Sequence, residues 1–157
     1  MMWFAEKVKT RQRGAVLVEM VLVTPILLVL LLVTADLTRA FIDHNTVTKA
    51  VRNGARYVAR NALEGTTGLV NIDATLRTET QNLVVFGSIN GGASPVVPGL
   101  TLANIAVVQI AGTDDIEVSA TYALGGLLGP VLPINLYTGN TISTARTLRA
   151  TVTMRAL

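Results

Sequence analysis

The sequence predicts an α+β chain in which a long N-terminal helix packs against a small C-terminal antiparallel sheet. An apolar run covers residues 15–35 and carries one charged side chain, that of Glu19. Apolar residues then recur at three- and four-residue steps to about residue 62, which is typical of an amphipathic helix. Two segments nearer the C-terminus alternate apolar and polar residues, as strands with one buried face do.

The apolar run has the length of a transmembrane helix. It holds 21 residues, and about 20 are needed to cross the hydrocarbon core of a bilayer. A helix at the surface of a soluble protein would place polar residues at every third or fourth position, and this run does not. We therefore expect residues 15–35 to span a membrane once.

The basic charge is concentrated in front of this run. Residues 1–14 carry four basic side chains against one acidic, and the remaining residues carry nine of each. A positive flank stays on the cytoplasmic side of a membrane, which predicts a cytoplasmic N-terminus and an extracytoplasmic body. Because nucleic-acid binding needs a basic patch on the folded domain, we expect no nucleic-acid partner.

Three parts of the chain are therefore expected. They are a basic leader over residues 1–14, a long helix over 15–62 and an extracytoplasmic α+β head over 63–157. The chain has no cysteine, which excludes thiol catalysis and thiolate metal sites. The only histidine, His44, lies on the apolar side of the long helix, so we expect no metal, no cofactor and no catalytic residue.

The second half of the long helix is predicted to have two faces. The apolar face comprises Leu37, Phe41, His44, Thr48, Val51, Ala55, Val58 and Ala62. The basic face comprises Lys49, Arg52, Arg56 and Arg60. A solvated helix surface is the expected role of these cations, and contact with phosphates or anionic lipid headgroups is the alternative.

The head is predicted to contain one short helix and three strands. The helix begins after an Asn71 N-cap and continues to about residue 85, with Ile72, Leu76 and Leu83 on one face. Residues 87–99 hold glycines and prolines and are expected to form a loop.

The strands are expected over residues 102–110, 116–122 and 147–155. The turn 112–115 joins the first two, and its acidic residues favour a solvated hairpin over a calcium site. The inward-facing residues are predicted to be Ile116, Val118, Ala120, Tyr122, Leu148, Ala150, Val152 and Met154. Residues 125–136 are apolar but rich in glycine and proline, so we expect an irregular segment that is either a subunit contact or a cover over the sheet.

Residues around the start of the span carry the strongest functional signal. The basic leader ends at Gly14, the apolar helix begins at Ala15, and an acid follows at Glu19. Glycine leaves the backbone open to a protease, and an acid inside a span is costly and usually has a functional partner. Cleavage after Gly14 would create an amine on Ala15 that neutralises Glu19.

These residues resemble the processing site of type IV pilins and pseudopilins. RGAVLVEMVLVTPILLVLLL (13–32) and AVRNGARYVARNA (50–62) are similar to the TadE-like family of the tight-adherence pilus system. Within the second stretch, the family-typical motif comprises Gly54, Ala55, Arg56 and Tyr57, and we expect Arg56 to make a structural salt bridge or carbonyl contact.

The resemblance implies a pilin-like fold and a structural role without enzymatic activity. It implies cleavage by a prepilin peptidase and insertion into the inner membrane, where residues 15–35 contact lipid and other pilin or pseudopilin subunits. It also implies assembly by a pilus platform with a cytoplasmic ATPase. The chain is longer than is usual for a major tight-adherence pilin, so the resemblance favours a minor pseudopilin.

Other interpretations of the N-terminus remain open. Pro25 removes a helical hydrogen bond and predicts a kink, which would loosen the helix for the passage from bilayer to filament. An ordinary uncleaved anchor would make the chain a membrane-bound binding or adhesion module. A secretory signal cleaved near Ala35 is the third possibility, although its apolar run would exceed the usual 7–15 residues.

Overall fold

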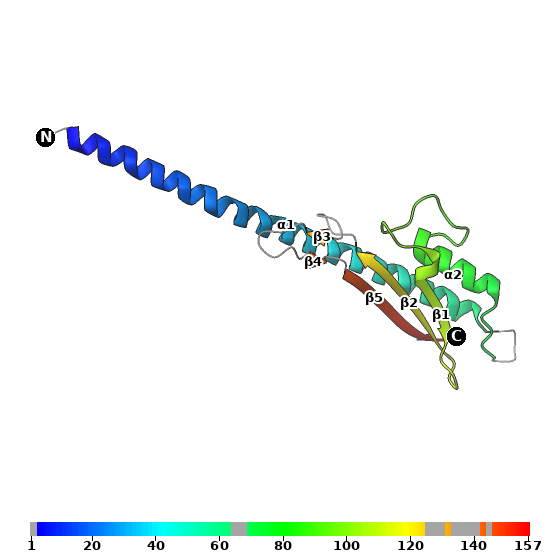
Figure 1. Ribbon diagram of the computed structural model, residues 1–157. Coiled ribbons are helices and arrows are strands. Elements are labelled where there is room, and N and C mark those ends of the chain that lie inside the picture. The colour runs from blue at the N-terminus through cyan, green and yellow to red at the C-terminus, as the bar shows by residue number, and fades with distance from the viewer. Residues whose placement is uncertain (1–2, 64–68, 125–130, 133–141, 144–145) are drawn as a thin grey trace. The chain divides into compact units, whose positions relative to one another are not determined.

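The computed structural model describes residues 3–63, 69–124, 131–132, 142–143 and 146–157 (Figure 1). By its internal contacts the chain divides into two units, Met1–Thr38 and Arg39–Leu157. Helix α1 (Trp3–Asn61) includes all described residues of the first unit and the start of the second. A long N-terminal helix and a small antiparallel sheet confirm the α+β, pilin-like fold class.

Helix α1 begins earlier than the apolar run. It starts at Trp3, so the described part of the basic leader is helical and continuous with the residues that follow. The leader contains no proline, and its two lysines, two arginines and single glutamate are good helix formers. The helix ends at Asn61, and Arg60 in its last turn complements the negative end of the helix dipole.

The second unit buries one face of α1. The buried apolar residues of this face are Ala40, Val47, Val51, Ala55, Val58 and Ala59, and Ala62 directly after the helix is buried as well. The predicted apolar face is therefore confirmed from Val51 onward, and it is wrong for Leu37 and Phe41, which are 58% and 71% exposed. The apolar periodicity extends farther toward the N-terminus than the core that covers it.

The four cations of the basic face lie on the exposed side of α1, as predicted. Lys49, Arg52, Arg56 and Arg60 are all exposed.

Helix α2 (Ala74–Phe86) is capped at both ends. The Asp73 carboxylate accepts a hydrogen bond from the Leu76 amide at 2.6 Å, and Gly87 closes the helix in the left-handed region at φ 75°. The prediction of Asn71 as the N-cap is wrong. Its backbone amide instead donates to the Ala62 carbonyl at 2.7 Å, so Asn71 belongs to the connection after α1 and not to the start of α2.

Helix α2 turns Leu76, Thr80, Val84 and Val85 into the core. Leu76 was predicted on this face, whereas Ile72 and Leu83 are only half-buried.

Three antiparallel strands form the main sheet, in the order β1-β2-β5. Their bounds are Ile105–Gln109 for β1, Asp115–Leu124 for β2 and Arg146–Arg155 for β5. Ala120 pairs with Ile105 on one side and with Ala150 on the other. A short 3-10 helix, η1 (Leu102–Asn104), precedes β1, which is therefore shorter than the predicted strand.

The alternation of the strands is confirmed. The side chains of Ile116, Val118, Ala120 and Tyr122 on β2 are all buried. On β5 Ala150 is buried, and Leu148, Val152 and Met154 are half-buried. Strand β5 is at an edge of the sheet, which explains why its inward side chains are less covered than those of the central strand β2.

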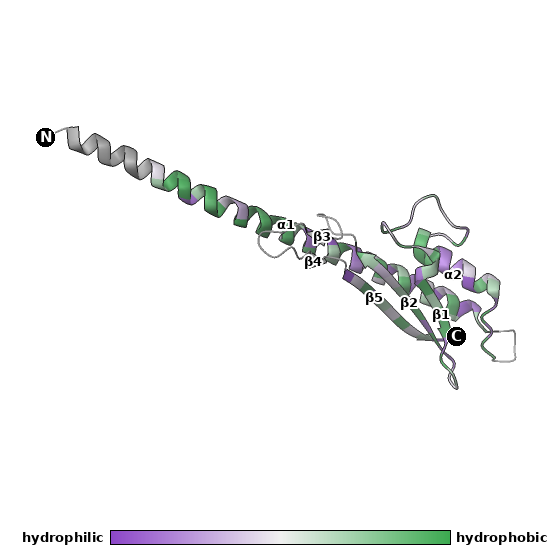
Figure 2. Ribbon diagram, viewed as in Figure 1, coloured by the Kyte–Doolittle hydropathy of each residue, from purple (hydrophilic) through white to green (hydrophobic). Residues whose placement is uncertain are grey.

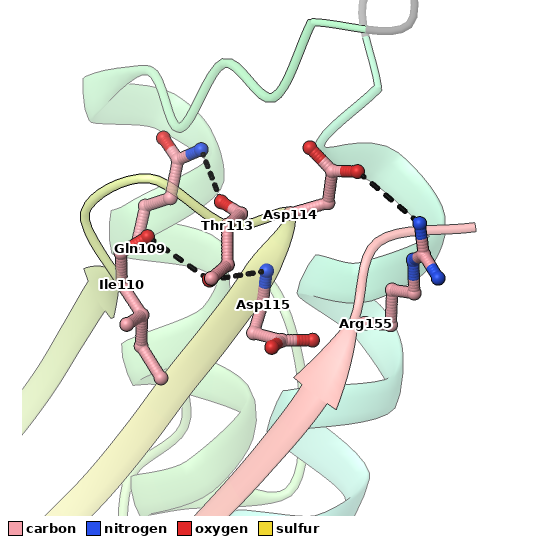
Figure 3. Close-up of polar contacts among 6 residues, drawn as sticks. All are labelled: Gln109, Ile110, Thr113, Asp114, Asp115 and Arg155. Atoms are coloured by element: carbon pink, nitrogen blue, oxygen red, sulfur yellow. Dashed lines mark hydrogen bonds and ion pairs between the residues drawn. The ribbon is translucent and has the colours of Figure 1, made fainter.

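The turn between β1 and β2 is closed by side chains (Figure 3). Gln109 Nε2 donates to the Thr113 carbonyl at 3.1 Å, and the Thr113 hydroxyl donates to the Ile110 carbonyl at 3.1 Å. Asp114 pairs with Arg155 at 3.5 Å. These contacts close the predicted hairpin, and residues 112–114 are exposed to solvent.

A second, two-stranded sheet pairs β3 (Val131–Leu132) with β4 (Ile142–Ser143). The expectation that 125–136 is irregular is therefore wrong for Val131–Leu132. The remaining residues of that segment, with the choice between subunit contact and cover, lie outside the described residues.

Candidate functional site

The apolar part of α1 is exposed, because no other part of the described chain covers it. Every large apolar side chain from Val16 to Leu31 is exposed, and Figure 2 shows this segment predominantly in the hydrophobic colour. Among the described residues, α1 is the one helix that is long and apolar enough to cross a membrane. A surface of this kind exceeds the exposed apolar patches of soluble monomers, so it needs lipid or other helices to cover it.

Gly14 stands at the boundary between the leader and this apolar segment. It lies inside α1, and a Cβ built on it would meet nothing within 4 Å. Glycine in a helix interior costs about 1 kcal/mol relative to alanine, so the helix is locally weak at this residue. The Gly14–Ala15 peptide bond is thus both uncovered and at a point where the helix opens more easily.

Glu19 lies four residues after Ala15 on the same helix. Residues at this spacing are neighbours on one helical face, so the Glu19 carboxylate can lie near the backbone nitrogen of Ala15. The side chain is exposed, and no hydrogen bond or ion pair joins it to any residue in the described part of the chain.

Helix α1 continues through Pro25. The Thr24 hydroxyl donates to the Met20 carbonyl at 2.7 Å. The Thr24 hydroxyl therefore does not donate to the Val21 carbonyl. An N–H at residue 25 would have donated to that carbonyl, but proline has none. The helix is locally depleted of one backbone hydrogen bond, whereas the predicted kink remains a prediction.

Gly54 and Ala55 lie where α1 and α2 touch. A Cβ built on Gly54 would sit 2.4 Å from Val84 Cγ2 and 3.5 Å from Thr80 Cγ2. Ala55 is fully buried in the same core. Only a residue without a side chain allows the two helices this close approach, so this half of the motif is a packing device.

Tyr57 connects the same two helices by a hydrogen bond. Its hydroxyl donates to Glu79 Oε2 at 2.7 Å, across 22 residues of sequence. The Glu79 carboxylate accepts this bond and raises the pKa of Tyr57 above its ordinary value, and burial and the negative charge act in the same direction.

Arg56 does not behave as expected. It is exposed, and the described residues offer it neither a salt bridge nor a carbonyl contact. It instead lines a groove beside Arg60 and Arg155, a feature that no sequence pattern indicated.

Metal-ligating chemistry is absent from the part of the chain that the structure describes. No group of three histidine or acidic side chains gathers there. His44 is half-buried on α1, and Glu117 pairs with Arg149 at 3.5 Å rather than forming an ion site with its neighbours.

The sequence did not predict the state of one buried polar atom, the hydroxyl oxygen of Tyr122. The Tyr122 hydroxyl is buried and finds no hydrogen-bond partner among the described residues. Burial raises the pKa of Tyr122, and the negative charge of Asp43 raises it further. The alternation of β2 predicted that Tyr122 points inward, but it gave no sign that the hydroxyl would lack a partner.

Comparison with known proteins adds one finding. Residues 14–56 match the model of the TadE-like protein family. The match begins at Gly14 and ends at Arg56, so it includes the boundary glycine, the acid in the span, the proline and most of the motif at the α1–α2 contact. No curated protein and no solved structure matches the chain.

Proposed function

We propose that this chain, TadE-like over residues 14–56, is a minor pseudopilin of a tight-adherence pilus or a related type II/IV secretion system. The family match indicates a protein associated with Tad pilus systems and a structural role. The observation that carries the finer proposal is the combination of an uncovered Gly14 with an exposed apolar helix segment that begins immediately after it.

The topology follows from charge and hydropathy. The basic leader stays in the cytoplasm, residues 15–35 cross the inner membrane, and the head lies outside. In the membrane, lipid covers the apolar side chains, and in the assembled state the helices of other pilin or pseudopilin subunits cover them.

Processing is the first step. A prepilin peptidase hydrolyses the Gly14–Ala15 bond, which leaves a carboxylate on Gly14 and an amine on Ala15. The helix has to open locally for its backbone to enter a protease, and glycine makes that opening easier. The leader then separates from the membrane helix.

Charge neutralisation is the second step. The new Ala15 ammonium lies one helical turn from Glu19, and the two charges neutralise each other within one subunit or between neighbours. A carboxylate costs up to about 3 kcal/mol at the centre of a span and less near its end, and pairing between neighbouring subunits favours close contact of their helices.

Assembly is the third step. The pilus platform extracts the subunit and exchanges lipid for helix contacts. Pro25 weakens the helix within the span and eases its change of curvature. Gly54 and Tyr57 hold the aqueous end of α1 to α2, so that the pull on the helix moves the head with it.

The mass of the protein recovered from its host tests this proposal. The pseudopilin begins at Ala15, whereas a secretory signal would leave a chain beginning near Asp36. An intact chain with its methionine would instead support the uncleaved anchor that carries a binding or adhesion module.

Two variants sharpen the test. Gly14→Leu places a branched side chain at the cleavage point and should abolish processing. Ala35→Leu is the matched control, because it blocks a signal peptidase without touching the Gly14–Ala15 bond. Normal cleavage of Gly14→Leu, or loss of cleavage only in Ala35→Leu, overturns the proposal.

A further inference from the structure

A groove lined by both apolar and basic residues lies where the end of α1 meets the end of β5. It has a volume of about 370 Å³. Its lining consists of three apolar residues, Ala59, Met154 and Leu157, and three arginines, Arg56, Arg60 and Arg155. The Leu157 amide donates to the Ala59 carbonyl at 2.9 Å, which fixes one wall of the groove to the helix.

The three arginines of the groove make few ion pairs with described residues. Arg56 and Arg60 have no ion pair with any described residue, and the pair between Arg155 and Asp114 is 3.5 Å long and solvent-exposed. Exposed pairs of this kind contribute less than about 1 kcal/mol. The chemistry that fits the groove is therefore an apolar side chain accompanied by carboxylates.

The same unit carries a surface of that chemistry. A polar pocket of about 320 Å³ lies at the start of α2 and includes Asp73 and Glu79. One oxygen of each carboxylate is used within the chain, by the Leu76 amide and by the Tyr57 hydroxyl. Each keeps a second oxygen for a partner.

An exposed apolar side chain precedes this pocket. Leu69 is 69% exposed and lies four residues before Asp73. Leu69 is not part of the pocket lining, but it precedes the two carboxylates in the sequence. Together, this leucine and the two carboxylates match the apolar and basic lining of the groove in polarity and charge.

The two surfaces face different directions on one unit. Arg60 lines the groove and Asn61 lines the acidic pocket, and successive helical residues point about 100° apart around the axis. They are therefore not a single self-complementary patch. Contact between them is heterologous, which means that different surfaces of the two copies meet.

We propose that the basic groove of one copy receives Leu69, Asp73 and Glu79 of a second copy of this chain. The inference rests on the proposed function in one respect, because subunits gathered by their apolar helices reach a high effective concentration in the membrane. Under that condition, a contact that is weak between free heads is sufficient to set the order of neighbouring heads.

Cysteine cross-linking of the full chain tests this contact, since the natural sequence has no cysteine. One tagged chain carries Leu157→Cys in the groove and a second carries Thr75→Cys in the acidic pocket. Both substitutions keep all three arginines and both carboxylates. Co-expressed in membranes and oxidised, the two chains should form a mixed dimer.

A matched pair sets the background. Leu157→Cys combined with Thr151→Cys, which is exposed on β5, should cross-link at least about threefold less. The inference is overturned if the mixed-dimer yield of the Thr75 pair does not exceed this background. The same result is expected if a different subunit occupies the groove.

Conservative neutralisation tests the electrostatic part. Asp73→Asn keeps an N-cap and Glu79→Gln keeps an acceptor for Tyr57, so the fold should survive while two negative charges are lost. We expect cross-linking of the Thr75 pair to fall about threefold and to lose its sensitivity to salt. Unchanged yield and salt dependence would contradict a charge-directed contact.

A second comparison tests the apolar part. Leu69→Ser should reduce the mixed dimer severalfold, whereas Val108→Ser, at a position 56% exposed on β1, should leave it unchanged. Equal effects of the two substitutions would overturn the role of Leu69.

The N-terminus of the same samples separates this inference from the proposed function. Chains that begin at Ala15 but give no specific mixed dimer contradict the head contact alone. Chains that retain the leader contradict the pseudopilin proposal, and a specific mixed dimer in those chains would still support the head contact.

Discussion

Gly54 of α1 lies directly against Val84 of α2, so closely that a Cβ at residue 54 would stand 2.4 Å from Val84 Cγ2. Both residues are buried, and the contact determines how near the two helices of the head can come. The glycine belongs to the segment that matches the TadE-like family, while its partner lies outside that segment.

Gly54→Ala is expected to destabilise the head by about 1–3 kcal/mol, as overpacking of a core does. Alanine gains up to about 1 kcal/mol in helix propensity, but Val84 is β-branched and has essentially one rotamer in a helix, so it cannot move aside. Thermal unfolding of the detergent-purified chain would measure the change. Adding Val84→Ala should recover part of the loss, Asn53→Ala should be neutral, and an unaltered Tm for Gly54→Ala would refute the expectation.

Tyr57→Phe removes the hydrogen bond to Glu79 and is expected to cost about 1 kcal/mol at neutral pH. The pKa of Tyr57 is raised in the folded state, so the wild-type contribution is complete below the unfolded value of about 10 and is lost as the pH rises through the folded value. The difference between wild type and variant should therefore shrink in alkaline solution. Denaturant unfolding at a series of pH values measures it, and a difference that grows above pH 10 would be inconsistent with this bond.

Tyr122→Phe should leave stability unchanged or increase it by about 1 kcal/mol, because the buried hydroxyl has no partner among the described residues. The phenylalanine keeps the ring that fills the core and removes only the unsatisfied oxygen. Calorimetry of the two chains decides the point. A clear loss of stability would show that the hydroxyl is bonded in the native protein.

Pro25→Ala restores a backbone donor and strengthens the helix within the span. We expect normal insertion and cleavage but a severalfold lower incorporation into assembled pili, because the helix loses its point of weakness. Thr24→Val is a suitable control, since it removes the hydroxyl bond to Met20 without changing any backbone donor. Wild-type incorporation of Pro25→Ala would end the proposed role of the proline.

Glu19→Gln keeps the size of the side chain and removes its charge. Insertion and cleavage should be unaffected, and incorporation should fall about tenfold or more. Hydrogen bonds to charged groups contribute about 1.5–3 kcal/mol, and about 1.4 kcal/mol corresponds to a factor of ten. Quantitative immunoblotting of sheared pili against the membrane fraction gives the ratio, and Glu19→Asp should retain part of the effect of the natural residue.

Local patterns predicted much of the fold. The alternation around Val118 and Ala150 identified two strands and their buried faces, because strand periodicity is a property of neighbouring residues. The start of α2 was mispredicted, since Asn71 and Asp73 are equally good caps by local criteria. The backbone bond from Asn71 to Ala62 decides between them, and that bond depends on how the chain returns from α1.

The candidate site divides in the same way. Gly14, Glu19 and Pro25 stand out because each is anomalous for its own position in an apolar helix, and no distant residue is needed to see it. The partners of Gly54 and Tyr57 are on another helix, and the role of Arg56 depends on where β5 ends. No spacing within α1 carries that information.

By itself, the sequence determined the apolar span with its basic flank, the strand pattern of the head and the order of these elements. The length of an apolar run and its periodicity are properties of neighbouring residues. They determine whether a segment prefers lipid, water or a buried face without reference to distant residues. Only the tertiary structure decided that Phe41 stays exposed, that Gly54 meets Val84, and that three arginines surround one groove. Those outcomes depend on which distant segments meet and how far the core extends along α1.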